Sequence, residues 1–131
     1  MPMKPAKNSI DIGILVQDIT KSLAFYEGLL GLRKLGEMPV SFGRMYRLAF
    51  GESAVKLIAP STVPPPGATG LTKLLGYRYL TFVVSNLDEV CAECERAGVH
   101  FDVTKRELRP GLHIAMVRDP DGNVVEFVQQ A

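Results

Sequence analysis

The chain has 131 residues, enough for one globular domain or for two small modules that share a core. Hydrophobic residues make up 47% and charged residues 22%, which is typical of a folded protein and excludes a disordered one. Fifteen Lys and Arg against 14 Asp and Glu leave a net charge of +1, so the strong basic field of a nucleic-acid binder is excluded. No apolar run approaches the roughly 18 residues that span a bilayer. Residues 1–8 lack the apolar stretch of a secretory signal, and we expect them to form a flexible tail. Two cysteines are too few for a disulfide framework, so we expect a cytoplasmic protein. We expect neither membrane nor nucleic-acid partners.

The first ordered segment has the alternation of a strand. Within Ile10–Val16, one face carries Ile10, Ile12, Ile14 and Val16, and the other carries Asp11, Gly13 and Leu15. A helix is predicted next, with Asp18 as its N-cap and Gly31 in the left-handed conformation that ends it. Its apolar stripe is Ile19, Leu23, Tyr26 and Leu30.

The same pattern occurs again about 68 positions later, which indicates an internal repeat. Tyr79–Val84 predicts a strand, Asn86 takes the cap position, and Gly98 ends the helix. The second helix has the apolar stripe Leu87, Val90, Cys91 and Cys94.

Strand-like segments follow each predicted helix. They are residues 44–50 and 54–58 in the first half, and 113–118 and 124–129 in the second. A Pro-rich stretch separates the halves and contains three consecutive prolines, which favour an extended linker. The prediction is an α+β chain of two βαβββ modules, with module one at 9–60, the linker at 61–76 and module two at 77–131.

Three stretches together resemble the vicinal oxygen chelate superfamily of glyoxalases, bleomycin-resistance proteins and extradiol dioxygenases. They are Val16–Tyr26, Leu30–Leu32 and Arg118–Phe127, the last containing Asp-Pro-Asp-Gly and a closing Glu. The resemblance covers about residues 10 to 130 and implies paired βαβββ modules whose sheets curl around a concave pocket. Asp-Pro-Asp-Gly alone is most often only a turn.

In metal-dependent members the resemblance implies four side chains, usually His and Glu, around a divalent ion that stabilises an enolate or alkoxide. Alignment on the two caps and the closing Glu places these positions at Asp11, Lys56, Tyr79 and Glu126, of which only Glu126 is usual. An ammonium about 4 Å from a divalent ion is repelled by roughly 8 kcal/mol at an effective dielectric of about 20. A slip of one residue would place Leu57 there, which cannot ligate either. We therefore predict no cofactor and disfavour a divalent metal.

Two interpretations of these four positions stay open. In the first, Lys56 is a tethered cation that replaces the metal between Asp11 and Glu126, with Tyr79 completing a charge-compensated cluster. In the second, the four positions are former ligands on a binding pocket and Lys56 reaches solvent.

Other polar residues are weaker candidates for ligand binding. Depending on which face each strand turns inward, either Arg44 with Tyr46, or Arg47, fixes an anionic or aromatic ligand. His113 is a candidate base or ligand contact, with no partner evident in the sequence. Cys91 and Cys94 form a C-x-x-C on the helical stripe, which favours core packing over redox or zinc chemistry.

Three functions compete. The first is a metal-free small-molecule binder similar to the bleomycin-resistance branch, and the second is an isomerase or lyase. In the second, Glu126 moves a proton next to a carbonyl while Lys56 or Tyr79 acts as the electrophile. The third is a metal-dependent glyoxalase or dioxygenase with unusual ligands. Proteins of this length that resemble it are usually homodimers, so we expect one.

Overall fold

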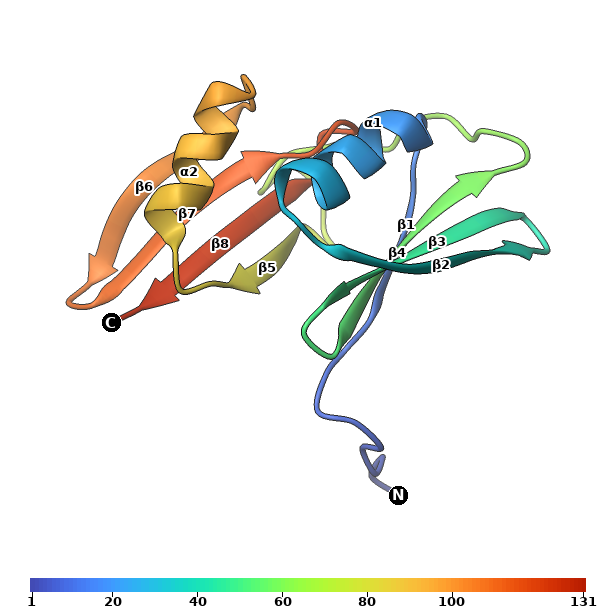
Figure 1. The fold of residues 1–131 in the computed structure, drawn as a ribbon, viewed down its shortest axis with the longest axis horizontal. Helices are drawn as coiled ribbons and strands as arrows, with labels where there is room; N and C mark the ends of the chain where they lie inside the picture. Colours follow the sequence, from blue (N-terminus) through green and yellow to red (C-terminus); the bar gives the residue numbers. More distant parts are fainter. The chain divides into compact units, whose positions relative to one another are not determined.

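The computed structural model describes all 131 residues and divides into two compact units, Met1–Pro65 and Pro66–Ala131 (Figure 1). Each unit is a four-stranded mixed sheet with helical structure between its first and second strands. The two βαβββ modules predicted from the sequence are therefore confirmed. No helix in the chain is long and apolar enough to cross a membrane.

The first unit begins with β1 (Ile12–Leu15), followed by α1 (Ile19–Leu23) and a π-helical segment, η1 (Ala24–Leu29). Three strands follow, namely β2 (Arg33–Val40), β3 (Gly43–Phe50) and β4 (Ser53–Pro60). Their order in the sheet is β1-β4-β3-β2, and β1 runs parallel to β4 while the other pairs are antiparallel.

The second unit repeats this topology. It contains β5 (Tyr79–Val83), α2 (Leu87–Arg96), β6 (Phe101–Arg109), β7 (Leu112–Arg118) and β8 (Val124–Gln130). The sheet order is β5-β8-β7-β6, again with the first strand parallel to the last.

Each sheet buries one face against its helix. In the first unit α1 packs on β4, and Leu48 and Leu57 are fully buried on the same face as Val55. In the second unit α2 packs on β7 and β8 with Leu87, Cys91 and Cys94 buried. Burial of one such large apolar side chain contributes about 1.5–3 kcal/mol, so these layers hold each module together.

The first helix differs from a regular α-helix. Beyond Leu23 it widens into η1, where the Leu30 amide donates to the Phe25 carbonyl five residues back. The wider turn accompanies burial of both Phe25 and its neighbour Tyr26, whose rings meet edge to face at 4.9 Å. Gly31 has a φ of 79°, which confirms the predicted left-handed end.

The second helix begins at the predicted position but is capped differently. The Asn86 side chain makes no cap bond and instead donates to Glu89 Oε2 at 3.2 Å. Gln129 Oε1, from β8, accepts the Leu87 amide at 2.8 Å. The first free amide of α2 is thus satisfied by the sheet, which ties helix and strand together.

No helix or strand lies between β4 and β5. Within the second unit, Leu71 from this stretch packs against a cluster of Ile114, Met116 and Val124. That cluster lies on the sheet face opposite α2, so Leu71 covers part of this face.

The two helix starts give a test of the fold. Asp18 Oδ1 accepts from the Thr20 amide at 3.0 Å and the Lys21 amide at 3.3 Å. Asp18→Ala should lower the free energy of unfolding by about 1 kcal/mol, because these amides lose their acceptor. The matched Asn86→Ala should cost less in the same urea titration, because Gln129 already caps α2. A larger loss for Asn86→Ala than for Asp18→Ala would contradict this assignment.

Candidate functional site

Strand register decides which side chains face the helix and which face outward. Partners opposite each other in a ladder project to the same face, and neighbours along a strand alternate. In each unit one face is covered by its helix; we call the opposite one the open face.

Lys56 and Glu126 occupy equivalent positions in the two repeats. Lys56 in β4 pairs with Gly13 in β1, and Glu126 in β8 pairs with Thr81 in β5. Gly13 and Thr81 lie at the same place relative to the helix caps that follow them. Both Lys56 and Glu126 therefore stand on open faces, in the same rung of their sheets.

The register also decides between Lys56 and Leu57. Leu57 pairs with Ile14 and is fully buried on the helix-covered face. Lys56, by alternation, is the residue that the first unit presents on its open face. The alignment that equates Lys56 with a ligand position thus agrees with the register of the sheet.

Lys56 lies directly opposite a second cation. Its partner in β3 is Arg47, and the two side chains share the open face. Both are half-buried, and neither side chain takes part in a hydrogen bond or an ion pair. Like charges at facing positions of a sheet repel each other, so this pair destabilises the sheet.

Asp11, which immediately precedes β1, is already engaged. Its Oδ1 accepts from Lys7 Nζ at 2.7 Å and from the Ala54 amide at 2.8 Å. The Lys7 hydrogen bond, then the Ala54 amide, lower the pKa of Asp11, and the positive charge of Lys56 acts in the same direction. The carboxylate therefore holds the start of β1 against β4.

The second unit presents the other two predicted positions. Glu126 Oε1 accepts from the Thr81 hydroxyl at 2.8 Å. Tyr79 lies two residues before Thr81 on the same face of β5, with 53% of its surface exposed. A carboxylate and a phenol thus share the open face of this unit, while Asp11 and Lys56 belong to the first unit; the four-residue cluster stays a prediction.

The structure separates the three polar candidates of β3. Arg44 and Tyr46 alternate with Arg47 and lie on the other face of the sheet. Arg44 pairs with Glu37 at 3.1 Å, which lowers the pKa of Glu37, and Lys34 lies 5.3 Å from the Tyr46 ring. Of the three, only Arg47 shares a face with Lys56.

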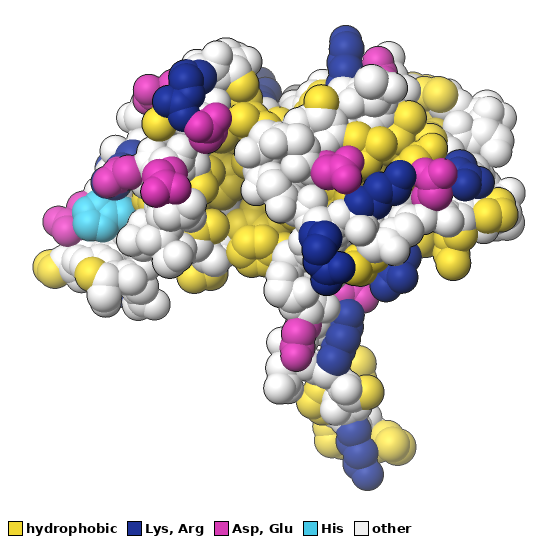
Figure 2. Space-filling view, in the orientation of Figure 1, with side chains coloured by type: hydrophobic (Ala, Val, Ile, Leu, Met, Phe, Trp, Pro, Cys, Tyr) yellow, Lys and Arg dark blue, Asp and Glu magenta, His cyan; other side chains and the backbone are white.

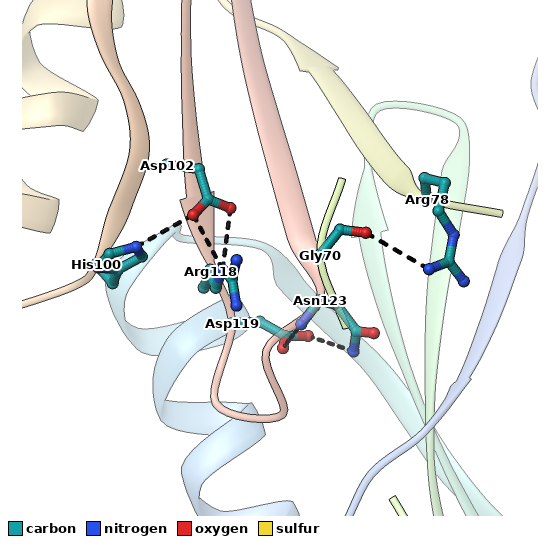
Figure 3. Close-up of polar contacts among 7 residues, drawn as sticks. All are labelled: Gly70, Arg78, His100, Asp102, Arg118, Asp119 and Asn123. Atoms are coloured by element: carbon teal, nitrogen blue, oxygen red, sulfur yellow. Dashed lines mark hydrogen bonds and ion pairs between the residues drawn. The ribbon is translucent and has the colours of Figure 1, made fainter. Parts of the chain in front are cut away.

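Each of the two histidines contacts a carboxylate other than Glu126. His113 pairs with Gln129 on the face that α2 covers, and its Nε2 lies 3.4 Å from Glu107 Oε2. His100 contacts Asp102 at 3.1 Å, and Asp102 also accepts from Arg118 Nε (Figure 3). The bond from Arg118 is the main cause of the lowered pKa of Asp102.

The Asp-Pro-Asp-Gly segment forms the turn between β7 and β8. Asp119 is buried and accepts from the Asp121 amide. It also accepts from the amide and the side chain of Asn123 (Figure 3). Gly122 has a φ of 85°, a conformation that favours glycine. This motif therefore sets the register in which β8 enters the sheet and delivers Glu126.

The site residues do not fit the usual metal-ligand set. No three His, Cys, Asp or Glu side chains come together in a group that could hold an ion. In the first unit one of the two aligned positions is a cation, and the other is a carboxylate already bonded to an amide and an ammonium. These donors favour an anion over a divalent cation.

Charged side chains are mixed on the surface. On the face shown in Figure 2, Lys and Arg are interspersed with Asp and Glu, and no single basic field forms. This distribution agrees with the net charge of +1.

The family model described as Glyoxalase/Bleomycin resistance protein/Dioxygenase superfamily matches residues 10–127. The chain belongs to this superfamily. An uncharacterised protein of Bacillus subtilis, YwkD, is 27% identical over 91% of this chain and 94% of its own length. A lactoylglutathione lyase of Schizosaccharomyces pombe is 28% identical over 90% of this chain, which spans only 46% of that enzyme.

Solved structures agree with this membership. A glyoxalase family protein from Bacillus cereus is 18% identical, with a TM-score of 0.80 over 97% of this chain and 99% of that one. TnmS3, an antibiotic binding protein from Streptomyces sp. CB03234, is 26% identical, with a TM-score of 0.72 over 98% of this chain and all of that one. The α+β fold is therefore that of the superfamily.

Two features of the open faces were missed by sequence reasoning. One is Thr81, which holds Glu126, and the other is the pairing of Arg47 with Lys56. The 68-residue offset could have identified Thr81 as the counterpart of Gly13. The Arg47–Lys56 pair requires the register of the β3–β4 hairpin, in which Gly51 follows Phe50 with a φ of 57°.

The C-x-x-C motif gives a pH-dependent prediction. Both thiols are free and buried, and burial raises the pKa of Cys91 and raises that of Cys94 to about 11. The native thiols should therefore resist a disulfide reagent at pH 8 and react on unfolding in urea. Because the folded pKa is raised, protonated Cys94 favours folding below about pH 9, and this contribution is lost as the pH approaches 11. Rapid labelling of folded protein at pH 8 would contradict core packing.

Proposed function

We propose that this protein binds a small organic molecule on its open sheet faces and does so without a divalent metal. The observation that carries the proposal is the Lys56–Arg47 pair, which stands at the rung where Glu126 stands in the second repeat. A sheet that keeps two facing cations with no hydrogen-bonded or ion-paired carboxylate retains a destabilising pair, which favours a role in ligand recognition. The similarity to an antibiotic binding protein supports the same function class.

We also infer that the protein works as a cytoplasmic homodimer. Edge strands β1 and β5 carry exposed apolar side chains, among them Leu15, Tyr79 and Val83. Pairing or covering such edges is the usual way in which proteins protect them. Sedimentation equilibrium should give about twice the 14.4 kDa of one chain at micromolar concentration, and a mass of one chain would contradict the dimer.

A thermal-shift screen tests metal-free binding. Ligands should raise the unfolding temperature in buffer that contains EDTA. A ligand that binds only the native state stabilises it by about 2.7 kcal/mol when the ligand concentration is 100 times the dissociation constant. The same ligands should give the same shift after addition of zinc, nickel or manganese. Shifts that vanish in EDTA and return with one of these metals would contradict the proposal.

A second candidate is a lyase or isomerase that moves a proton next to a carbonyl. Glu126 favours it, because this carboxylate is held by Thr81 on an open face that also carries Tyr79. The similarity to lactoylglutathione lyase supports this chemistry, and Tyr79 in the same unit is the candidate electrophile.

Turnover separates the two candidates. If Glu126 is the base, Glu126→Gln should lower the rate of lactoylglutathione formation by about 100-fold or more, since the amide cannot accept the proton. Glu107→Gln is the matched control and should keep the rate. The Glu107 carboxylate contacts His113 on the sheet face that α2 covers, opposite to the face of Glu126. If the wild-type protein shows no turnover, the lyase candidate is excluded and only the binding function remains.

A further inference from the structure

The open face of the first unit is arranged as two adjacent rows that run across its strands. The first row, which we call the cationic row, consists of Gly13, Lys56, Arg47 and Gly36 in β1, β4, β3 and β2. The second row, the apolar row, consists of Leu15, Ile58, Met45 and Met38 in the same four strands. The rows lie two residues apart along each strand, a spacing of about 7 Å.

The cationic row has space around its two charges. Glycines stand at both of its ends, so Lys56 and Arg47 have no side chain beside them in the row. A Cβ at Gly36 would meet nothing within 4 Å, and a Cβ at Gly13 would meet only Ile58 Cδ1 at 3.9 Å. A group of the size of a carboxylate therefore has access to the two cations.

No acidic side chain of the sheet neutralises this row. The open-face positions of β2, β3 and β4 contain no Asp or Glu. The Asp11 carboxylate before β1 interacts electrostatically with Lys56, but it is hydrogen-bonded to the Lys7 ammonium and the Ala54 amide. The glutamate of β2, Glu37, pairs with Tyr46 and lies on the other face with Arg44.

The apolar row offers a surface for the body of a ligand. Met38 is 48% exposed and its neighbour Met45 is half-buried, so both are accessible, whereas Ile58 in the next strand is buried and supports the row from below. Methionine side chains adapt to the shape of a ligand and make favourable contacts with aromatic rings. The ligand surface is thus charged in one row and apolar in the next.

From this arrangement we propose that the first unit binds an amphipathic organic anion, and this proposal rests on the small-molecule binding proposed above. The carboxylate or phosphate of the ligand lies between Lys56 and Arg47, and its flat apolar body lies along the Met45–Met38 row. The Arg47 guanidinium matches a two-oxygen acceptor, while the Lys56 ammonium supplies the second positive charge. The second unit does not offer the same anion site. Its corresponding positions are Glu126, which repels an anion, and Met116, which has no charge to bind one.

Matched naphthalene probes test the charge requirement. 2-Naphthoate and naphthyl phosphate are the anionic probes, and 2-naphthamide is the neutral control of the same shape. Calorimetry at low salt should show tighter binding of the anions, and added salt should reduce the difference. Arg47→Met and Lys56→Met should each weaken naphthoate binding by about tenfold and leave naphthamide unchanged. Lys34→Met, a cation on the other face of the same sheet, is the matched control and should keep the preference.

The outcomes separate this proposal from the general binding function. Equal binding of naphthoate and naphthamide, or a preference that survives in the Arg47→Met/Lys56→Met double variant, would overturn the anion site while small-molecule binding stands. If neither anion binds to the wild-type protein while the wider screen finds other ligands, the anion site is also overturned. The wider thermal-shift screen decides independently whether the protein binds small molecules at all.

The melting temperatures of the same variants show whether they fold. Both methionine variants should melt at the wild-type temperature or above it, because each removes one of two facing like charges. Naphthoate should raise the melting temperature of the wild-type protein and of Lys34→Met but not that of the double variant. A double variant that melts at the wild-type temperature and is still stabilised by naphthoate contradicts the site.

Discussion

The parallel pairing of the first strand with the last strand in each unit is the constraint on which the candidate site depends. A shift of one residue in the register of this pairing would turn every side chain of β4 to the other face of the sheet. Leu57 would then leave the core, and Lys56 would enter the layer under α1, where an unpaired ammonium is strongly unfavourable. The burial of Leu57 and its neighbours therefore fixes Lys56 on the open face.

The two repeats keep one architecture and present different chemistry. At one rung, the first unit carries Lys56 beside Arg47, and the second unit carries Glu126 beside Met116. Thr81 holds the glutamate, whereas glycine stands at the corresponding place beside Lys56. Since both rungs are built by the same strand pairing, a few side-chain identities suffice to place two cations at this rung in the first unit and a carboxylate in the second. The fold leaves Lys56 and Glu126 free to differ because both side chains are only half-buried and neither belongs to the buried core.

The sequence predicts the modules well where apolar periodicity and turn residues agree. The strand before Asp18 and the turn that starts at Asp119 follow from alternation, from short-range hydrogen bonding and from glycines with positive φ. Strands β2 and β6 were not located, because both lie at sheet edges and most of their side chains are exposed. Ile10 was predicted within the first strand, but β1 begins at Ile12 and Ile10 is largely exposed.

Side-chain direction and long-range partners lie beyond the reach of sequence reasoning. The faces of Arg44 and Arg47 depend on the register of a hairpin, and the cap of α2 comes from Gln129, 42 residues away from Leu87. Lys56 could be aligned with a ligand position from the caps, but its pairing with Arg47 could not. These are tertiary facts, because they depend on which strand lies beside which.

The most direct test of the account is the divalent-metal content of the wild-type protein, purified without a metal-affinity tag and measured by mass spectrometry. Because Lys56 and the engaged Asp11 leave the first unit without free donors, the account predicts zinc, nickel, iron and manganese well below one atom per chain. Stoichiometric metal that survives dialysis would contradict it, and Lys56 would then have to turn away from the open face.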